Sequence, residues 1–553
     1  MSAIKRNKSV TNRPNEAKVV TDLSELLAIS DKSEREKSFN VLVNHLLLNK
    51  CFADKCHDLV QLLSQLATDL VRWQTCDKLI DKLLQELNVW TIDDKEVYAK
   101  YFHVISEAIN LKPFKCPQLL ETIVLQKFNG LSKFKDETQI QPQELTMFDE
   151  MHSLLSHIKI AKFEHTFLRC IDRKFPFLSH ISCVHSFQCF VYNVFKVYDY
   201  ITAKYKHKLL SLIFEKIIEM DIAVTSDKNK ITEDVFIIDD CNTAMKSIQT
   251  TVLDNTLQIL FDFIENKVTN NTKDENEELF DIIKLLFPQD ILQMVSCNHL
   301  QYVWLYLCYL SNQFFDQFID YLWDLGHNNE VSLDIREKCL YFMSSLLKNA
   351  NFVAIDTVMT FMNMCTVWLH KYIEQNDRSV DQLTTEDTIF YIICQILFDT
   401  FCSIHSDLDN LSLRRVKAMN FQRIIKCKLN PLAVCHREIE SNFLSLARHY
   451  QIGYTAQNVD SSDDRLKYPE DVLHSGSYVC PKSMTRLQDY CKHSINSCDN
   501  SVKDTNDRLN RFNTSDDSDH MFGSYKMSYS PSKTLWQNLL SDSSPNDHQM
   551  DCD

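Results

Sequence analysis

The scarcity of glycine is the feature that most constrains the fold of this chain. Only 5 of its 553 residues are glycine, alongside 11 prolines, whereas glycine makes up about 7% of an average protein. Tight turns with positive φ and loops that cradle phosphates both need glycine. The sequence contains neither GxGxxG nor GxxxxGK[ST], which argues against a dinucleotide-binding fold, a P-loop or a kinase-type glycine loop. We therefore expect an all-α protein with short connections.

Hydrophobic periodicity gives the expected architecture. From about Glu16 onward, apolar residues recur at steps of three and four in successive segments that are separated by short polar joints. This pattern is typical of amphipathic helices that pack in layers. No fixed repeat length is present, so the sequence predicts a HEAT-like stacked α-hairpin solenoid rather than a tetratricopeptide or ankyrin array. The many aromatic residues of 279–452 are expected to form core between helix layers rather than a platform for stacking bases.

Polar interruptions and a change of composition after about residue 455 give the expected domain organisation. The last part of the chain is rich in Ser, Asp and Asn and has few aliphatic residues, so it cannot support a core. The predicted divisions are a disordered N-terminus (1–16), a helical-repeat domain (17–455) with loops near 131–146, 225–240 and 269–278, an irregular extension (456–495) and a disordered tail (496–553).

The stretch LNPLAVCHREIESNFLSLARHYQIGY (429–454) is predicted to be a single helix that closes the folded body. Asn430 suits the N-cap, Pro431 suits the first helical position and Gly453 suits the stop. One apolar stripe is expected to pack inward; it comprises Leu432, Cys435, Ile439, Phe443, Leu446 and Tyr450.

Charge and cysteine usage indicate the environment. The formal net charge is −16, which opposes a general attraction to nucleic acid. Twenty cysteines without a CxxC pair, as at Cys365, Cys394 and Cys402 on apolar helical faces, suggest buried free thiols in a reducing compartment. The polar N-terminus shows no signal peptide, and no run approaches the roughly 18 apolar residues of a membrane span. We expect a soluble intracellular protein without a membrane partner.

A search for chemistry predicts no enzyme. HExxH and GxSxG are both absent, and the carboxylates are dispersed over polar helix faces, where solvation explains them. We therefore expect no catalytic residues, no metal site and no cofactor.

Two features could carry binding or regulation. A basic segment could contact nucleic acid or an acidic protein. The alternative interpretation is that it is an ordinary charged helix face, opposite an apolar face formed by Leu411, Val416, Phe421 and Ile424. Phosphorylation of the acidic tail would add further charge. The basic segment comprises Arg414, Arg415, Lys417, Arg423, Lys426 and Lys428, and the candidate phosphosites are Thr514, Ser530 and Ser544.

The stretch that begins at Leu429 also carries a family resemblance. LNPLAVC (429–435) resembles the LNPL-x-[VI]-C helix of the RNA polymerase I-specific transcription initiation factors, also called the transcription initiation factor IA type. Further blocks in the order of that family are 301–323, 336–373, 388–408 and 419–432. Asp399 stands where the family pattern has an aromatic residue. The resemblance covers about 150–455 well and 20–150 weakly.

The resemblance implies a non-enzymatic HEAT-repeat factor of the nucleus and nucleolus. Such a factor would bind RNA polymerase I at its stalk and dock subunits and bridge the enzyme to the promoter-bound core or selectivity factor, under control by phosphorylation. DNA would be contacted at most through the local basic segment. The alternative is a helical-repeat nuclear scaffold or transport adaptor, which would share the physical features but not the ordered blocks.

Two sets of surface residues follow from the resemblance. The family docks the polymerase through a serine-rich patch, and the nearest hydroxyls here are Ser179, Ser182 and Ser186. If the apolar stripe of 429–454 packs inward, a partner would meet the opposite face of that helix, through His436, Arg437, Glu440 and Arg448.

Overall fold

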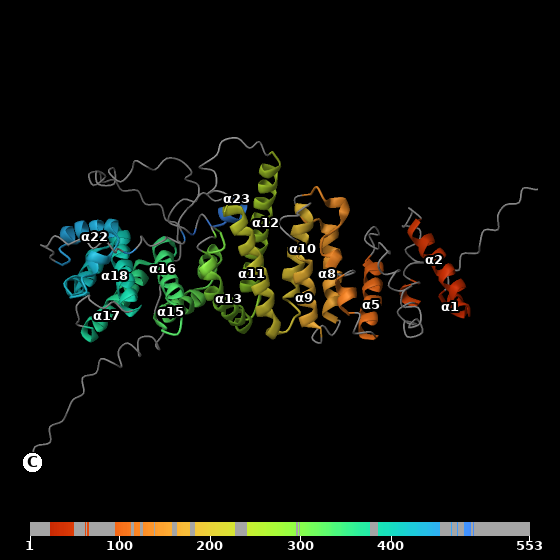
Figure 1. The fold of residues 1–553 in the computed structure, drawn as a ribbon, viewed down its shortest axis with the longest axis horizontal. Coiled ribbons are helices and arrows are strands. Elements are labelled where there is room, and N and C mark those ends of the chain that lie inside the picture. The colour runs from red at the N-terminus through yellow and green to blue at the C-terminus, as the bar shows by residue number, and fades with distance from the viewer. Residues whose placement is uncertain are drawn as a thin grey trace, which may run out of the picture. The chain divides into compact units, whose positions relative to one another are not determined.

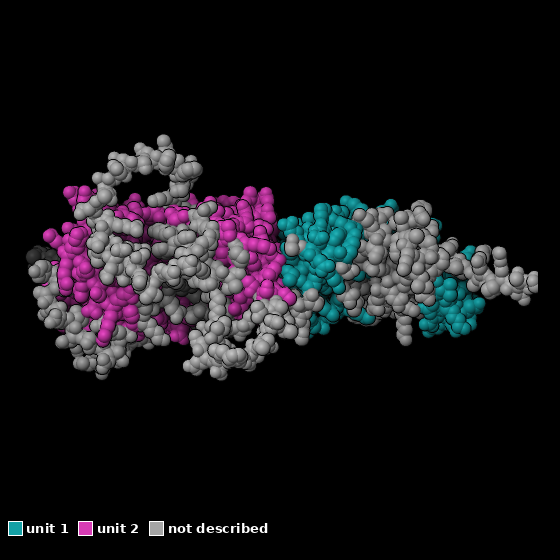
Figure 2. Space-filling model, turned by 90° about the horizontal axis from the view of Figure 1, so that it is seen from above, with its two compact units in different colours: residues 1–209 teal, residues 210–553 magenta. Residues whose placement is uncertain are grey.

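The chain folds into helices in two compact units. The structure, a computed structural model, describes residues 23–48, 61, 63–65, 95–111, 116–121, 125–137, 139–157, 163–176, 183–226, 240–294, 297, 299–376, 385–453, 466, 473, 480–487 and 490. Figure 2 colours the units Met1–Leu209 and Leu210–Asp553, and the division falls inside α11 (Ala203–Ser226). Every regular element in these ranges is a helix (Figure 1), which confirms the all-α fold.

Unit 1 places its apolar stripes between neighbouring helices. α5 packs on α8, and the inward face of α5 carries Val97, Tyr101, Val104 and Ile105, which are at most 1% exposed. The elements of this unit are α1 (Leu23–Ala28), α2 (Lys32–Leu48), α5 (Lys95–Leu111), α6 (Cys116–Leu119), α7 (Leu125–Lys127), η6 (Ser132–Phe134), α8 (Pro142–His157), α9 (Glu164–Lys174), α10 (Val184–Val197) and the start of α11.

Unit 2 stacks helices that are near neighbours in the chain, as the solenoid pattern predicts. α15 packs on α14 and α16, and α18 packs on α16, α17 and α22. The elements are the rest of α11, α12 (Asp240–Asn270), α13 (Lys273–Met294), α14 (Tyr302–Leu310), α15 (Asn312–His327), α16 (Leu333–Asn349), α17 (Ile355–Gln375), α18 (Thr385–Ile404), η10 (His405–Asp407), α19 (Asn410–Ala418), α20 (Phe421–Ile425), α21 (Pro431–Val434), α22 (Arg437–Tyr450) and α23 (Pro481–Thr485).

Aromatic side chains fill the centre of unit 2. Trp304 is fully buried, and the centroid of its ring lies 5.7 Å from that of Phe214 and 5.3 Å from that of Phe287. Phe287 continues the cluster onto Phe318 and Phe342 at 5.2 and 4.9 Å. Such edge-to-face pairs stabilise a core beyond the area that they bury. The aromatic residues in this part of the chain are therefore core, as expected.

Two of the predicted loops are shorter than the sequence suggested. In 131–146, η6 and the first residues of α8 take up half of the segment, and in 269–278 only residues 271 and 272 separate α12 from α13. Both polar stretches are helix starts. Glu275 accepts from the Thr272 backbone N–H at 2.9 Å and Glu144 accepts from the Gln141 backbone N–H at 3.1 Å, as the third helical residue does in a capping box.

The predicted single helix at 429–454 is two helices. Cys435 is extended (φ −61°, ψ 153°) between α21 and α22, and His436 begins α22 by accepting from the Glu438 N–H at 3.3 Å. Gln395 of α18 holds this break through a 2.9 Å bond from the His436 N–H to its Oε1. Asn430 makes no side-chain cap because it lies in the left-handed region (φ 42°), and α22 ends at Gln451 (φ 55°), before Gly453.

Nor does α22 close the folded body. Residues of the predicted irregular extension return along unit 2; we name the described part, Leu466, Leu473, 480–487 and Tyr490, the C-terminal strap. The Leu466 N–H donates to Val434 O at 2.8 Å. Leu473 O accepts from the Tyr302 hydroxyl at 3.2 Å, and the Leu473 N–H donates to Ser345 Oγ at 3.1 Å.

The far end of the strap binds α12. Asp254, only 3% exposed, accepts from the N–H groups of Lys482 (3.1 Å) and Ser483 (2.8 Å), so its carboxylate caps α23 from another helix. Arg486 pairs with Asp262 and Glu265 of α12. The strap thus joins elements that lie more than 200 residues apart in the chain.

Tyr490 ends the described strap against α14 and the connection between α16 and α17. Its ring stacks on Tyr309 with centroids 3.7 Å apart, and its carbonyl accepts from the Asn351 N–H at 3.0 Å.

One helix of unit 2 is long and apolar enough to cross a membrane. The segment Asp387–Asp407, mostly α18, has a mean hydropathy of 1.4, but 78% of its most apolar stretch is buried inside the protein. Because α18 packs on α16, α17 and α22, its apolar surface is accounted for by the core. The predicted N-terminal lead (1–16), most of the loop at 225–240 and the tail (496–553) lie outside the described residues.

Candidate functional site

The predicted basic segment lies on the surface of unit 2. It belongs to α19, α20 and the turn that follows, and five of its six cations are exposed while Arg423 is half-buried. Arg415 Nη1 lies 2.7 Å from Asp356 Oδ1, and Arg423 Nη2 lies 2.9 Å from Glu374 Oε1. Within the described part of the chain, no ion pair is formed by Arg414, Lys417 or Lys426, which therefore supply the positive charge of this surface.

Leu411 contradicts the expected division of α19 into two faces. Val416, Phe421 and Ile424 are at most 1% exposed, as predicted, but Leu411 is 65% exposed. The cause is the start of the helix. Asp409 accepts from the Ser412 N–H at 2.7 Å, and with the helix start fixed there, Ser412 and Val416 face inward one turn apart. Leu411 therefore stands among the exposed arginines.

The residues predicted to meet a partner on α22 differ in exposure. Arg437 and Arg448 are exposed, whereas His436 and Glu440 are half-buried. Ile439 and Phe443 pack inward, and Ala447 is buried in place of Leu446, which is half-exposed. The basic segment precedes α21 and α22 in the chain, and α20 packs on α21.

Only one residue of the predicted hydroxyl patch lies among the described residues, so the patch stays a prediction. Ser179 and Ser182 lie outside the described residues, as do the candidate phosphosites Thr514, Ser530 and Ser544. Ser186 is half-buried in the first turn of α10, where its N–H contacts Cys183 Sγ at 3.5 Å.

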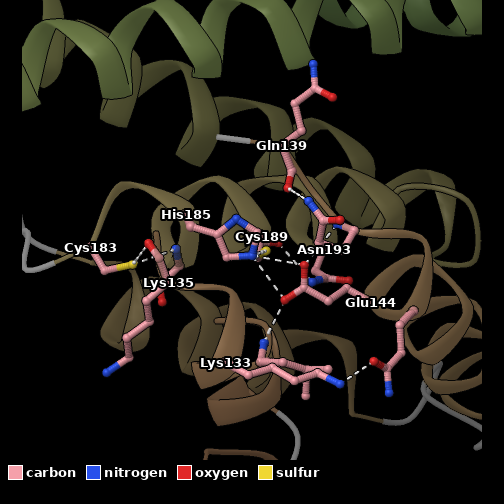
Figure 3. Close-up of polar contacts among 12 residues, drawn as sticks. Lys133, Lys135, Gln139, Glu144, Cys183, His185, Cys189 and Asn193 are labelled. Carbon is pink, nitrogen blue, oxygen red and sulfur yellow. Dashed lines mark hydrogen bonds and ion pairs between the residues drawn. The ribbon is translucent and has the colours of Figure 1, made fainter. Parts of the chain in front are cut away.

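A buried polar cluster in unit 1 was not predicted. His185 Nε2 lies 3.0 and 2.9 Å from the two carboxylate oxygens of Glu144 and 3.4 Å from Cys189 Sγ, so the two side chains meet one edge of the imidazole ring (Figure 3). All three residues are buried, and their donor atoms lie within 4.8 Å of one another. Burial raises the pKa of the Cys189 thiol, and the Glu144 carboxylate adds to the effect. Of the groups formed by described residues, only this one could hold a metal ion.

Backbone groups fix the carboxylate of this cluster. Glu144 Oε1 accepts from the Leu131 N–H at 2.7 Å and Oε2 from the Gln141 N–H at 3.1 Å. Gly130 closes the cluster from the side: it has φ +75°, and a Cβ there would lie 2.7 Å from Glu144 Oε1 and 2.8 Å from Cys189 Sγ. Only glycine satisfies both the backbone conformation and the space.

A neighbouring network fixes α8 against α10. His152 Nε2 donates to Asn193 Oδ1 at 2.9 Å, and His152 Nδ1 accepts from the Tyr200 hydroxyl at 3.0 Å. Asn193 Nδ2 in turn donates to the carbonyls of Phe128 and Cys189, which sets the orientation of its amide. The neutral form of His152 satisfies every one of these bonds.

We expect unit 1 to lose stability in mild acid because of His152. Burial is the main cause that lowers the pKa of His152 to about 4, from about 6.5 in an unfolded chain. Between these values the unfolded state binds a proton that the folded state excludes, so the free energy of unfolding falls as the pH drops. Urea unfolding from about pH 7 to about pH 4.5 should show a loss about 1–3 kcal/mol larger in the wild type than in His152→Gln. Equal losses would contradict this assignment.

The signal that sequence analysis missed is the spacing of His185 and Cys189. Residues four apart share one face of a helix, and a histidine and a cysteine on one face can chelate a metal. Glu144 could not be found in this way, because it comes from α8, 41 residues away in the chain. The strap residues gave no signal either, since the partners of Asp254 lie more than 220 residues away.

Comparison with known proteins agrees with the resemblance. The family model described as RNA polymerase I specific transcription initiation factor RRN3 matches residues 26–245 and 225–490. A Mus musculus protein named RNA polymerase I-specific transcription initiation factor RRN3 is 26% identical over 349 residues, which are 55% of this chain and 52% of that protein. A Schizosaccharomyces pombe protein, rrn3, is 21% identical over 426 residues, which are 68% of this chain and 69% of that protein.

The fold agrees with these sequence matches. The crystal structure of RNA polymerase I transcription initiation factor Rrn3 matches with a TM-score of 0.62 at 19% identity, covering 78% of this chain and 86% of that one. At this identity the match bears on the fold alone. The chain spans about half the length of the mouse relative. Since the family model covers most of the chain, through both units, the chain belongs to the RRN3 family of RNA polymerase I-specific transcription initiation factors.

Proposed function

We propose that this protein binds RNA polymerase I and bridges the enzyme to the core factor on the promoter of the ribosomal RNA genes. The observation that carries the proposal is the family match over residues 26–490. Stacked helices offer long surfaces for docking. The protein acts by binding rather than by catalysis, and its place of work is the nucleolus.

The positive surface of unit 2 is the proposed contact with a protein partner. Arg414, Lys417 and Lys426 are exposed, on a chain whose net charge is −16. A local patch of opposite sign to the whole chain favours an acidic partner surface and fixes its orientation. Leu411, which is 65% exposed, adds an apolar contact at the same place.

Reversing this charge should weaken polymerase binding. We expect the triple variant Arg414→Glu, Lys417→Glu, Lys426→Glu to retain less than about one tenth of the wild-type RNA polymerase I in a pull-down from nuclear extract, because rim charges act on association and register. The matched control reverses two exposed lysines of α11, Lys204 and Lys208, and should bind as the wild type does.

Two outcomes would count against the proposal. Equal retention by the triple variant and the control would remove the basic surface from the interface. Recovery of a transport cargo in place of polymerase I subunits, by the wild type, would favour the adaptor alternative and overturn the proposed function itself.

A further inference from the structure

Four donor atoms from three buried residues converge in unit 1. They are the two carboxylate oxygens of Glu144, His185 Nε2 and Cys189 Sγ, and both other groups lie 2.9–3.4 Å from the imidazole nitrogen (Figure 3). Glu144 comes from α8, whereas His185 and Cys189 lie one turn apart on α10.

A single imidazole nitrogen binds at most one proton. With Nε2 protonated, its N–H donates to the Glu144 carboxylate, and the Cys189 sulfur, 3.4 Å away, is only a weak acceptor of the same proton. A metal ion would instead serve all three groups at once.

A cation would also suit the charges of the cluster. The Glu144 carboxylate is 0% exposed, and its hydrogen bonds come from two backbone N–H groups and from the His185 ring. Among the described residues no lysine or arginine pairs with it, and Lys133 bonds Gln143 Oε1 instead. A divalent cation bound by a carboxylate, a thiolate and a neutral imidazole would be balanced, because the two anionic ligands carry two negative charges.

We propose that Glu144, His185 and Cys189 bind a zinc ion that ties α8 to α10. Zinc takes oxygen, nitrogen and sulfur ligands together in tetrahedral sites. Its bond lengths of about 2.0–2.3 Å place neighbouring ligand atoms about 3.3–3.7 Å apart, so the present separations need to grow by only a few tenths of an ångström. With one oxygen of Glu144 engaged, the three residues supply three of the four tetrahedral ligands.

The surroundings of Glu144 fit a ligand held in place. Each of its oxygens accepts one backbone N–H, from Leu131 or Gln141, and keeps a lone pair for the metal. Such outer contacts orient the ligands of metal sites. His185 Nδ1 has no hydrogen-bond partner among the described residues, so the outer support of this site runs through Glu144 and through Gly130, whose missing Cβ leaves space for Glu144 and Cys189. Binding would release the thiol proton to solvent as the metal displaces it.

Metal content tests the proposal on the full-length protein. After expression with added zinc and dialysis, we expect about one zinc per chain in the wild type and less than about one tenth in Cys189→Ser and His185→Gln. Cys170→Ser is the matched control, because Cys170 is also a fully buried cysteine of unit 1 and lies outside the cluster; it should keep the zinc.

A second measurement does not depend on variants that fold. Replacing zinc by cobalt in the wild type should give the absorption of a tetrahedral cobalt site with a thiolate-to-cobalt charge-transfer band, and a strong chelator should lower the melting temperature. A wild-type protein without bound zinc, a cobalt spectrum without the thiolate band, or equal zinc loss in Cys170→Ser and Cys189→Ser would each overturn the proposal.

Discussion

Glu144→Ala is expected to lower the free energy of unfolding by about 3–5 kcal/mol, because it removes a buried carboxylate and leaves several hydrogen-bond donors unpaired. The substitution leaves three donors without their common acceptor: the buried Leu131 N–H, the buried His185 imidazole and the part-buried Gln141 N–H. Urea unfolding followed by circular dichroism would measure the loss. The effect should appear as an early unfolding step confined to unit 1.

Asp149→Ala is the matched control for this prediction. Asp149 lies on the same helix, α8, but is exposed, so its removal should change the free energy of unfolding by no more than about 0.5 kcal/mol. A loss of the same small size for Glu144→Ala would show that the cluster does not hold unit 1 together.

Asp254→Ala is expected to release the C-terminal strap and to cost about 2–3 kcal/mol, because the buried N–H of Ser483 and the part-buried N–H of Lys482 lose a charged acceptor. The freed strap would expose the side chains under Tyr490 and become a target for proteases. Limited proteolysis should therefore cut Asp254→Ala after Lys482 or Arg486 at least about ten times faster than the wild type, since cleavage follows the population of the open form.

Asp262→Ala, on the same helix α12, is the control. Asp262 also binds the strap, through Arg486, but its side chain is 54% exposed, and exposed ion pairs contribute only about 0–1 kcal/mol. Asp262→Ala should therefore leave the cleavage rate near that of the wild type. Cleavage of Asp254→Ala at the wild-type rate would mean that the strap is held elsewhere, by Tyr490 and Leu473.

The helical character of the fold could be predicted from local properties of the chain. Few glycines and a spacing of three to four apolar residues indicate helices wherever they occur, and this holds for α5 and α15 as much as for α22. The ends of the helices were harder to predict. The polar stretches at 131–146 and 269–278 each contain a glutamate three residues after a capping position, which is typical of a helix start. Because the polar composition of these stretches was interpreted as loop, the starts of α8 and α13 were not predicted.

The break before α22 depends on a residue that is distant in sequence. Nothing in LNPLAVCHRE itself stops a helix at Cys435; the His436 N–H is instead bound by Gln395 of α18. Asp399, the departure from the family pattern, is explained in a similar way, since its carboxylate pairs with Lys348 of α16. Contacts between helices decide both features, and a single sequence does not show those contacts.

The same reason limits what could be said of the sites. The exposed cations of α19 and α22 follow from local periodicity and were predicted. The cluster of Glu144, His185 and Cys189 requires α8 and α10 to pack face to face with Gly130 against them. The bond from Ser483 to Asp254 joins residues 229 apart. Only the spacing of His185 and Cys189 is visible in the local sequence; no local pattern indicates that Glu144 joins them or that Asp254 binds the strap.

The most direct test of the central claim is transcription from a ribosomal RNA gene promoter in nuclear extract depleted of its own initiation factor of this family. We predict that the purified wild-type protein restores specific initiation by RNA polymerase I, and that the triple variant of Arg414, Lys417 and Lys426 restores less than about one tenth as much. Failure of the wild type to restore initiation, in an extract that responds to the endogenous factor, would contradict the proposed function.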